Sequence, residues 1–429
     1  MGQKIGNFIC NKNFLLFLQI EKLIFMKRNL FEALQSHLFK KEFTIITGAR
    51  QTGKTTLLYQ LESFCKEKDI KTVFFNLENK DLLLEFDRSP LNVLNFLPES
   101  DSRIIVFIDE IQYLKDPSNF LKLLYDDYSN NVKIIATGSS AFYIDKKFKD
   151  SLVGRKKIFH LYTCSFDEYL KIANKEELFE ELKRIRINPT AKSLKIKLLK
   201  QEWDNFMIYG GYPGVIKETT KENKIDYLKE IRNSFVKRDI LESGVQNENT
   251  FYALFRILAG QTGNLVNVNG LAGSLNIKSE TINNYLYVLQ KCFHIALITP
   301  FYKNIRKELT KMPKVYLFDN GLRNSLINNF EMPIFRQDKG ELWENLFFRL
   351  LIEKYDVEEI SFWRTSEGNE VDFVMSKTEN QFAVEVKYDK NTIRESKYKQ
   401  FRETYPEIPF YFANIEPFEE DFFRQFIYF

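Results

Sequence analysis

The chain has 429 residues, which is too long for one ordinary domain and predicts two to four domains. Its apolar content of 44% is typical of globular proteins, and its formal charge of +4 neither requires nor excludes a nucleic-acid partner. No apolar run reaches the roughly 18–20 residues that span a bilayer, so we expect no membrane partner and a cytoplasmic protein. The four cysteines are far apart and form no C-x-x-C pair, which predicts reduced core residues.

A patterned helix is predicted over residues 26–41, where leucines recur at every fourth position and polar residues fill the other faces. Residues 1–25 are therefore interpreted as an N-terminal extension. Met26 competes with Met1 as the natural start of the protein.

The stretch FTIITGARQTGKTTLL, residues 43–58, organises the rest of the chain. A β-branched strand leads into a loop that fits G-x-x-x-x-G-K-S/T, and a helix is predicted to follow over residues 55–68. Such a loop curls its backbone N–H groups around a phosphate chain, which predicts binding of a nucleoside triphosphate, ATP. Lys54 would reach the β- and γ-phosphates, and the Thr55 hydroxyl would bind Mg²⁺. The residues expected to contact the nucleotide are Gly48, Ala49, Arg50, Gln51, Thr52, Gly53, Lys54, Thr55 and Thr56.

Two further strands are expected before residue 112. Residues 71–77 predict a second buried strand, followed by a polar connection through Pro90 and a helical stretch over residues 91–97. Residues 103–112, RIIVFIDEIQ, predict a central parallel strand buried on both faces. It ends in Asp109, which would hold Mg²⁺, and Glu110, which would polarise the attacking water.

The strand predicted over residues 132–136 ends in TGSS, residues 137–140. Thr137 is the best candidate for a hydroxyl that senses the bound nucleotide, and ordinary turn chemistry is the alternative. Arg155 follows, and it is assigned to the transferred phosphate, either in cis or from a neighbouring subunit. A surface arginine is the alternative for this position.

These motifs now support a resemblance. TGARQTGKTTLL, FIDEIQYL, ATGSSA and LVGRKKIFHLYTCSFDEYL, in this order, resemble the AAA-type ATPase domain of a large prokaryotic family that carries a C-terminal DUF4143 region. The resemblance implies that Lys54 and Thr55 bind phosphate and Mg²⁺, that Asp109 is the Walker B acid and that Glu110 is the catalytic acid. It continues at YGGYPGV, residues 209–215, which is similar to the glycine-rich turn of this family.

The middle of the chain predicts helices and then a winged helix-turn-helix. Lys-, Glu- and Leu-rich residues 176–204 and the amphipathic residues 227–241 suit a helical lid or linker. Three helices within residues 254–292, the third with Ser279 as its N-cap, precede two strands read as a wing. Residues predicted to face a DNA groove are Lys278, Asn283, Asn284, Lys303 and Arg306. A winged helix used only for protein packing is the alternative.

The last constellation lies in residues 340–387. Glu344 sits on a predicted helix, Asp372 on a strand, and Glu385 and Lys387 on the same side of the next strand. These four positions have the spacing of the PD-(D/E)xK nuclease fold. Asp372 and Glu385 would share Mg²⁺, and Lys387 would stabilise developing charge. A binding module that keeps the cluster as a salt-bridge network is the alternative.

The predicted fold class is α/β, with a P-loop AAA-type ATPase on a parallel sheet, a helical lid, a winged helix-turn-helix and a C-terminal α+β PD-(D/E)xK-like domain. The predicted boundaries are 1–25, 26–165, 166–245, 246–335 and 336–429. We expect a Mg²⁺-dependent ATPase that drives a DNA-binding C-terminal half, and the sequence leaves open whether that half also cleaves DNA. The alternative is an ATP-dependent switch whose C-terminal region only binds a protein partner or DNA. Either function is compatible with an oligomer.

Overall fold

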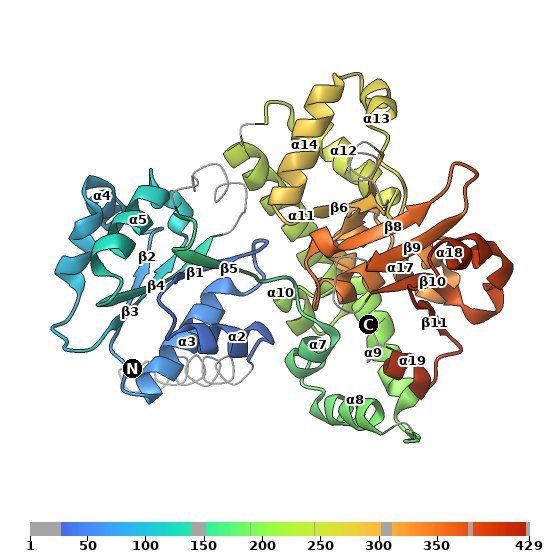
Figure 1. The fold of residues 1–429 in the computed structure, drawn as a ribbon, viewed down its shortest axis with the longest axis horizontal. Coiled ribbons are helices and arrows are strands. Elements are labelled where there is room, and N and C mark those ends of the chain that lie inside the picture. The colour runs from blue at the N-terminus through green and yellow to red at the C-terminus, as the bar shows by residue number, and fades with distance from the viewer. Residues whose placement is uncertain are drawn as a thin grey trace, which may run out of the picture. The chain divides into compact units, whose positions relative to one another are not determined.

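The computed structural model describes residues 27–138, 152–188, 190–243, 245–301, 311–375 and 381–425. Residues 1–25, Ser139, Ser140, Lys303 and Arg306, which the sequence predictions involve, lie outside these ranges. The chain divides into two compact units, residues 1–162 and residues 163–429 (Figure 1).

Unit 1 is built on a parallel five-stranded sheet in the order β2-β3-β4-β1-β5. Its strands are β1 (Phe43–Thr47), β2 (Thr72–Asn76), β3 (Ile104–Asp109), β4 (Val132–Gly138) and β5 (Lys156–His160). The order places β4 between β1 and β3. Parallel strands end at the same edge of a sheet, so the residues that follow β1, β3 and β4 come together there.

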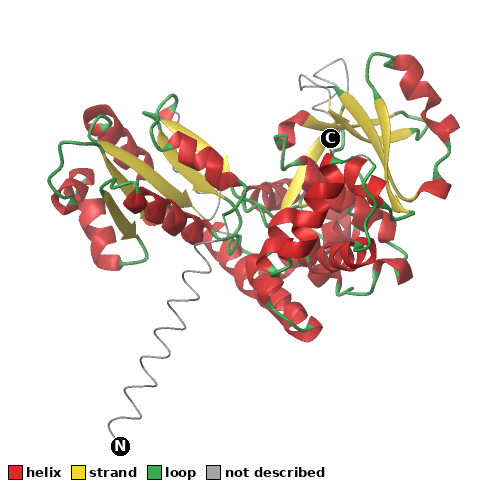
Figure 2. Ribbon diagram, turned by 90° about the horizontal axis from the view of Figure 1, so that it is seen from below, coloured by secondary structure: helices red, strands yellow, loops and turns green. Residues whose placement is uncertain are grey.

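Helices cover both faces of this sheet (Figure 2). One face packs against α2 (Leu30–His37) and α3 (Lys54–Glu67), through side chains such as Leu34 and Leu57. The other face packs against α4 (Lys80–Arg88), η1 (Pro90–Phe96) and α5 (Pro117–Tyr128), with η2 (Ile111–Tyr113) nearby. Alternate residues of β3 contribute to the two cores, which explains why its apolar run is continuous.

Two predictions for unit 1 were wrong in detail. Strand β2 is the edge of the sheet, and only Phe75 among its residues is fully buried. The segment read as a polar connection contains α4, which begins after Asn79, whose side chain accepts hydrogen bonds from the N–H groups of Asp81 and Leu82. Its charged residues form the solvent face of an amphipathic helix.

Unit 2 contains a six-stranded mixed sheet in the order β11-β10-β9-β8-β6-β7. Its strands are β6 (Ile295–Pro300), β7 (Lys314–Leu317), β8 (Ile360–Arg364), β9 (Glu370–Met375), β10 (Phe382–Asp389) and β11 (Phe410–Glu416). Strands β6 and β7 form the antiparallel hairpin predicted as a wing, but β6 also pairs with β8. One sheet therefore crosses the boundary predicted at residue 335, and the hairpin is an edge of the C-terminal sheet.

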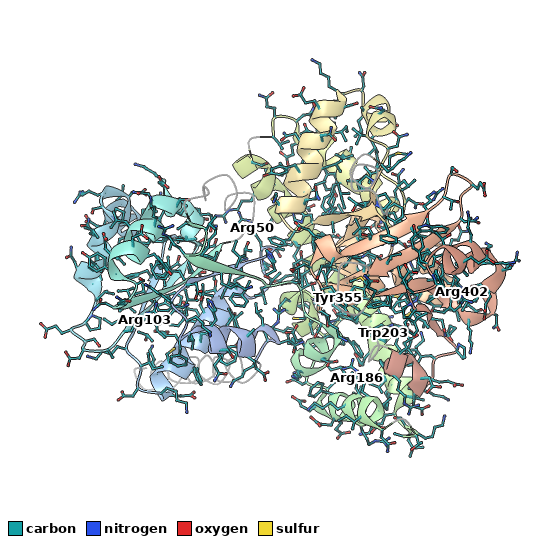
Figure 3. All side chains as sticks on the ribbon, viewed as in Figure 1. Arg50, Arg103, Arg186, Trp203, Tyr355 and Arg402 are labelled. Carbon is teal, nitrogen blue, oxygen red and sulfur yellow. The ribbon has the colours of Figure 1, made fainter. Side chains whose placement is uncertain are left out.

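The helices of unit 2 precede, separate or follow the strands of this sheet along the chain. They are α7 (Phe166–Ile172), α8 (Glu176–Ile187), α9 (Ile196–Tyr209), α10 (Pro213–Lys217), α11 (Lys221–Ser243), α12 (Glu248–Gly260), α13 (Val268–Leu275), α14 (Ser279–Lys291), α16 (Asn320–Ile327), α17 (Lys339–Leu351), α18 (Lys399–Thr404) and α19 (Glu420–Arg424). Trp203 on α9 joins several of them, because its ring contacts Phe166, Trp343 and Phe422 (Figure 3).

The YGGYPGV turn connects α9 to α10 and is held by a buried aspartate. The Asp319 carboxylate accepts hydrogen bonds from Gly211 N at 2.7 Å and from Leu322 N at 2.9 Å. Gly210 has φ +72°, and a Cβ atom there would lie 2.2 Å from the Asp319 carboxylate. The glycine is therefore required both by its backbone conformation and by the close approach of α16.

The helices predicted around the turn of the winged helix are present, with one correction. Helix α14 begins at Ser279, and its N-cap position is Lys278. The Ser279 hydroxyl instead donates to the Asn269 side chain at 2.8 Å. Cys65, Cys164 and Cys292 are buried and do not form disulfide bonds. Within the described ranges, no helix has the combination of length and apolar character needed to cross a membrane.

Candidate functional site

The glycine-rich loop, residues 48–55, connects the end of β1 to the start of α3. A Cβ atom on Gly48 would lie 2.1 Å from the carbonyl oxygen of Leu161, so only glycine fits where the chain leaves the sheet. Gly53 has φ +94° and is the N-cap residue of α3. The N–H groups of the first helical turn and the partial positive charge of this helix terminus make the loop suited to an anion.

Lys54 is folded back onto this loop. Its ammonium donates hydrogen bonds to the carbonyl oxygens of Gly48 at 3.0 Å and Ala49 at 2.8 Å, and the residue is 5% exposed. The Thr52 hydroxyl donates to the Ala49 carbonyl at 2.9 Å and fixes the curl of the loop. Arg50, labelled in Figure 3, is also largely buried in the loop. The lysine is thus held beside the helix terminus that would receive an anion.

Asp109 ends β3 and is bonded by two hydroxyl groups. Thr55 Oγ1 donates to Asp109 Oδ2 at 2.8 Å, and Thr137 Oγ1 donates to Oδ1. The carboxylate is 2% exposed, and burial raises its pKa, an effect that the two hydroxyl hydrogen bonds oppose. A buried carboxylate beside a threonine hydroxyl is an oxygen donor set of the kind that Mg²⁺ prefers.

Glu110 and Thr137 complete this constellation. Glu110 has φ +59°, an uncommon conformation for a residue with a side chain, and its carboxylate accepts a hydrogen bond from Gln112. Its backbone N–H donates to Thr137 Oγ1 at 3.1 Å. Thr137 therefore bridges the two acidic residues, because β4 lies between β1 and β3.

Arg28 is a contact of the loop that sequence reasoning missed. Its guanidinium donates to the Thr52 carbonyl at 2.6 Å and to the Tyr162 carbonyl at 2.8 Å. It precedes α2, which packs on the same face of the sheet as α3. No sequence motif marks it, because its role depends on the tertiary packing of α2.

Arg155 lies at the end of the strands that is opposite to the glycine-rich loop. The Phe43 N–H donates to the Arg155 carbonyl at 2.8 Å, so Arg155 is level with the start of β1, whereas the loop follows its end. Its guanidinium is paired with Asp126, with Nε 2.6 Å from Oδ1. Arg155 therefore does not lie beside the loop in this structure, and its contact with phosphate, in cis or from a neighbouring subunit, stays a prediction.

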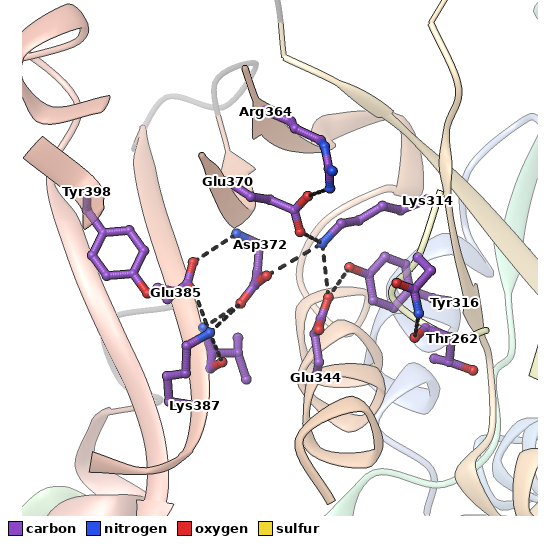
Figure 4. A network of polar contacts seen from close by, with 12 residues as sticks. Thr262, Lys314, Tyr316, Glu344, Arg364, Glu370, Asp372, Glu385, Lys387 and Tyr398 are labelled. Atoms are coloured by element: carbon purple, nitrogen blue, oxygen red, sulfur yellow. Dashed lines mark hydrogen bonds and ion pairs between the residues drawn. The ribbon is translucent and has the colours of Figure 1, made fainter. Parts of the chain in front are cut away.

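A second polar constellation lies in unit 2 (Figure 4). The four residues predicted from the nuclease-like spacing come together from α17, β9 and β10. Lys387 is paired with the Glu385 carboxylate and lies 3.9 Å from Asp372 Oδ2. Asp372 also accepts a hydrogen bond from the Val386 N–H at 2.9 Å. Burial, and next the charge of Asp372, raise the pKa of Glu385 above its usual range.

Five further members of this cluster within the described ranges were not predicted. They are Lys314 and Tyr316 on β7, Arg364 on β8, Glu370 on β9, and Tyr398. The Tyr316 hydroxyl donates to Glu344 Oε1 at 2.6 Å, and the Tyr398 hydroxyl donates to Glu385 Oε1 at 2.8 Å. The sequence shows that Lys314 and Tyr316 are two residues apart and so point to the same side of one strand. Nothing in the sequence links this pair to Glu344.

The ammonium of Lys314 lies among the acidic residues of this cluster. Its Nζ atom is 2.6 Å from Glu370, 3.3 Å from Glu344 and 3.5 Å from Asp372. Within the ranges described, no group of three or more His, Cys, Asp or Glu side chains has an arrangement that could hold a metal ion. Lysine ammonium groups thus lie against both predicted Mg²⁺ ligands, Lys314 and Lys387 at Asp372 and Lys387 at Glu385, so this donor set does not suit a divalent cation.

The segment predicted as a winged helix contains three described residues that were predicted to face a DNA groove. All three are exposed: Lys278, Asn283 and Asn284. The apolar side chains of α14, including Ile282, Tyr285 and Leu286, face inward. The helix thus offers a polar, weakly charged surface.

Three family models match the chain in succession. Residues 40–170 match an AAA domain, residues 200–332 match a domain of unknown function (DUF8612), and residues 339–416 match a domain of unknown function (DUF4143). The AAA match contains the glycine-rich loop, Asp109 and Thr137. Lys314 lies in the second match, whereas the carboxylates around it lie in the third.

Relatives extend along most of the chain. An uncharacterized protein of Methanocaldococcus jannaschii is 27% identical over 380 residues, 86% of this chain and 80% of that protein. An uncharacterized protein of Haemophilus influenzae is 24% identical over 384 residues, covering 85% of this chain and 87% of its own length. Neither is described by an activity.

Among solved structures, the chain is similar to the RuvB Holliday junction branch migration motor of Thermotoga maritima, with a TM-score of 0.34, 16% identity and coverage of 67% of this chain and 96% of that one. Domain III of the T. maritima replication initiation protein DnaA gives a TM-score of 0.30 and 17% identity, covering 49% and 95%. Scores this low carry no argument, so the assignment rests on the family models. The family models therefore assign an AAA domain to residues 40–170 and, further along the same polypeptide, a DUF4143 domain to residues 339–416.

Proposed function

We propose that the AAA domain binds ATP with Mg²⁺ and hydrolyses it, and that this cycle drives a C-terminal half that binds DNA. One observation carries the first part of the proposal. The hydroxyls of Thr55 and Thr137 both donate to the buried Asp109 carboxylate, beside the loop that holds Lys54. The proposal is supported by a helix terminus suited to an anion, a lysine and a buried carboxylate that lie in one stretch of the sheet edge.

The chain's own residues suggest how the site would work. Thr55 and Asp109 would hold Mg²⁺, which when bound neutralises charge on the transferred phosphate. Lys54 would exchange the carbonyl oxygens of Gly48 and Ala49 for phosphate oxygens, which are stronger acceptors for an ammonium group.

Glu110 would orient the attacking water. Its carboxylate is held by Gln112 and its backbone by Thr137, so a movement of Thr137 on contact with nucleotide would be passed directly to the catalytic acid. This arrangement supports a sensor role for Thr137, because one hydroxyl group contacts both acidic residues.

ATP binding and turnover by the purified full chain test this proposal. Lys54→Ala should weaken ATP binding by about 100-fold, the effect of losing a charge-assisted hydrogen bond. Glu110→Gln should keep ATP affinity and lower turnover by about 100-fold or more, as expected for a lost general base. Unchanged ATP affinity in Lys54→Ala would remove the proposal, and unchanged turnover in Glu110→Gln would place the base elsewhere.

For the C-terminal half, the exposed face of α14 supports DNA contact through Lys278, Asn283 and Asn284. Asparagine side chains can read base edges, whereas the lysine would contact phosphate. Affinity for a duplex should fall as salt rises, because phosphate contacts release counterions. The double variant Asn283→Ala, Asn284→Ala should lose sequence preference while Lys278→Ala weakens binding to all sequences; affinity independent of salt would indicate a protein partner instead.

The sequence left open whether the C-terminal half also cleaves DNA. A second candidate function keeps the ATP cycle and gives this half no nuclease activity. It is favoured by Lys314, whose ammonium is in contact with Glu344, Glu370 and Asp372. This candidate predicts that supercoiled and linear DNA stay intact with Mg²⁺ or Mn²⁺. DNA cleavage by the unmodified chain that is lost in Asp372→Asn would contradict this candidate and support nuclease activity.

A further inference from the structure

Lys314 is the most deeply buried charged group of the C-terminal cluster. It is 1% exposed, and its Nζ atom lies within 3.5 Å of three carboxylates. An ammonium group has three N–H donors, so one donor is available for each carboxylate. The residue begins β7, where its backbone pairs with Ile298 on one side and forms a bridge to Leu265 on the other. The strand therefore fixes the position from which the side chain reaches the acids.

Most of the negative charge of the cluster is compensated by its own side chains. Four carboxylates, those of Glu344, Glu370, Asp372 and Glu385, face three cations, those of Lys314, Lys387 and Arg364, which leaves a formal excess of one negative charge. Carboxylates buried without compensation would be strongly destabilising, so a cluster of this kind needs cations in place. Further hydrogen bonds to these carboxylates come from the hydroxyls of Tyr316 and Tyr398 and from the N–H groups of Asp372 and Val386.

We propose that the Lys314 ammonium takes the place of a divalent cation in this cluster, so that the C-terminal domain carries a built-in counterion and binds no Mg²⁺ there. A metal ion among the same oxygens would stand within contact range of the ammonium, and two like charges in a buried site repel strongly. The Lys314 ammonium also lies over the ring of Phe362, with Nζ 5.5 Å from the ring centroid. The inference concerns unit 2 alone and does not depend on ATP hydrolysis.

Mn²⁺ binding to the nucleotide-free full chain, measured by electron paramagnetic resonance, tests this inference. The parent protein carries Asp109→Asn, which removes the expected metal ligand of unit 1. The parent should show no site that depends on Asp372. Lys314→Ala should gain one Mn²⁺ site, at least about tenfold tighter than any site of the parent. Adding Asp372→Asn to that variant should abolish the gain, and Lys311→Ala, which changes an exposed lysine, should leave binding as in the parent.

A second variant covers the case in which Lys314→Ala does not fold. Lys314→Ala with Glu370→Gln removes one negative charge together with the positive charge, and tryptophan fluorescence reports whether unit 2 is folded. A gain of Mn²⁺ binding in either folded variant supports the inference. Tight Mn²⁺ binding by the parent that is lost in Asp372→Asn would overturn it, as would two folded variants that gain no site.

Discussion

Two buried aspartates, one in each unit, show how differently the same side chain can be stabilised. Asp109 is bonded by the hydroxyls of Thr55 and Thr137, which satisfy its oxygen atoms without bringing a positive charge. Asp372 is bonded by a backbone N–H and has the ammonium groups of Lys314 and Lys387 at 3.5 and 3.9 Å. Both residues end up within a few per cent of full burial.

The difference lies in the net charge left at each place. Hydroxyl groups can orient a carboxylate, but they do not neutralise it, and burial accordingly raises the pKa of Asp109. Lysine side chains do both at Asp372. The first site therefore has a use for a metal ion, whereas the second already contains its cations. The expected effects below test this contrast, beginning with the largest.

Removing the cation of unit 2 should have the largest effect on stability. Lys314→Ala leaves Glu344, Glu370 and Asp372 facing one another, and breaking a buried ion pair in this way costs about 3–5 kcal/mol. Urea unfolding followed by tryptophan fluorescence measures it, because all three tryptophans of the chain lie in unit 2. Lys311→Ala should change stability by no more than about 0.5 kcal/mol. A loss of less than about 1 kcal/mol in Lys314→Ala would mean that solvent already screens the cluster.

Exchanging each aspartate for asparagine should separate the two sites by activity. Asp109→Asn should lower ATP turnover by about 100-fold or more, because it removes the charge that would hold Mg²⁺. Asp372→Asn makes the same side-chain exchange in unit 2 and should leave ATP turnover unchanged. Steady-state ATP hydrolysis at saturating Mg²⁺ measures both, and equal losses would contradict the contrast.

The hydroxyl that joins Asp109 to Glu110 can be removed without changing the size of the side chain. Thr137→Val should lower kcat by about tenfold, the effect of leaving one buried hydrogen bond unmade. Thr44→Val is the matched control, because its hydroxyl contacts His37 near the start of β1 and not the site. A similar loss in both variants would indicate general destabilisation of the sheet.

Lys133 on β4 is a third buried charge, and like Asp109 it has no counterion in direct contact. Its ammonium donates to the carbonyls of Glu42 and Lys40, while burial, and next the charge of Arg103, lower its pKa from 10.5 to about 7. Glu42 opposes this shift, and His37 lies beside the amine at 3.3 Å.

Between pH 7 and 10 the unfolded chain therefore keeps a proton at Lys133 that the folded chain has lost. The stability of unit 1 should rise with pH in this window, by up to about 1.4 kcal/mol per pH unit from this residue, and the gain should be lost as pH falls towards 7. Hydrogen exchange of the β4 amides at pH 7.5 and 9.0, corrected for intrinsic rates, measures it. Lys133→Met should lose this rise; an equal rise in both proteins would assign it to other groups.

The smallest expected effect concerns Arg28. Arg28→Met removes the donors to the carbonyls of Thr52 and Tyr162 and should weaken ATP binding about fivefold, which corresponds to one ordinary hydrogen bond. Arg28→Lys keeps the charge but not the two-pronged geometry, so it should recover only part of the affinity. Equilibrium titration with a fluorescent ATP analogue measures both, and unchanged affinity would make Arg28 purely structural.

The sequence was most informative where the needed residues are adjacent. The strand, glycine-rich loop and helix from Phe43 to Glu67 follow one another in the chain, so their pattern predicted their structure directly. The same holds for the buried strand that ends in Asp109.

Positions that depend on tertiary packing were not predictable in this way. The bridging position of Thr137 follows from β4 lying between β1 and β3, an order that no local pattern contains. Lys314 reaches the acids only because the hairpin pairs with β8, although the sequence suggested a separate wing. The place of Arg155 could not be predicted either, since closeness in sequence to β4 does not determine at which end of the strands a residue lies.

Counting the divalent cations held by the full chain tests the contrast between the two sites most directly. With a non-hydrolysable ATP analogue present, the account predicts one tightly bound Mn²⁺ per chain, lost in Asp109→Asn and retained in Asp372→Asn. Two bound ions, or a single ion that is lost in Asp372→Asn and kept in Asp109→Asn, would contradict it.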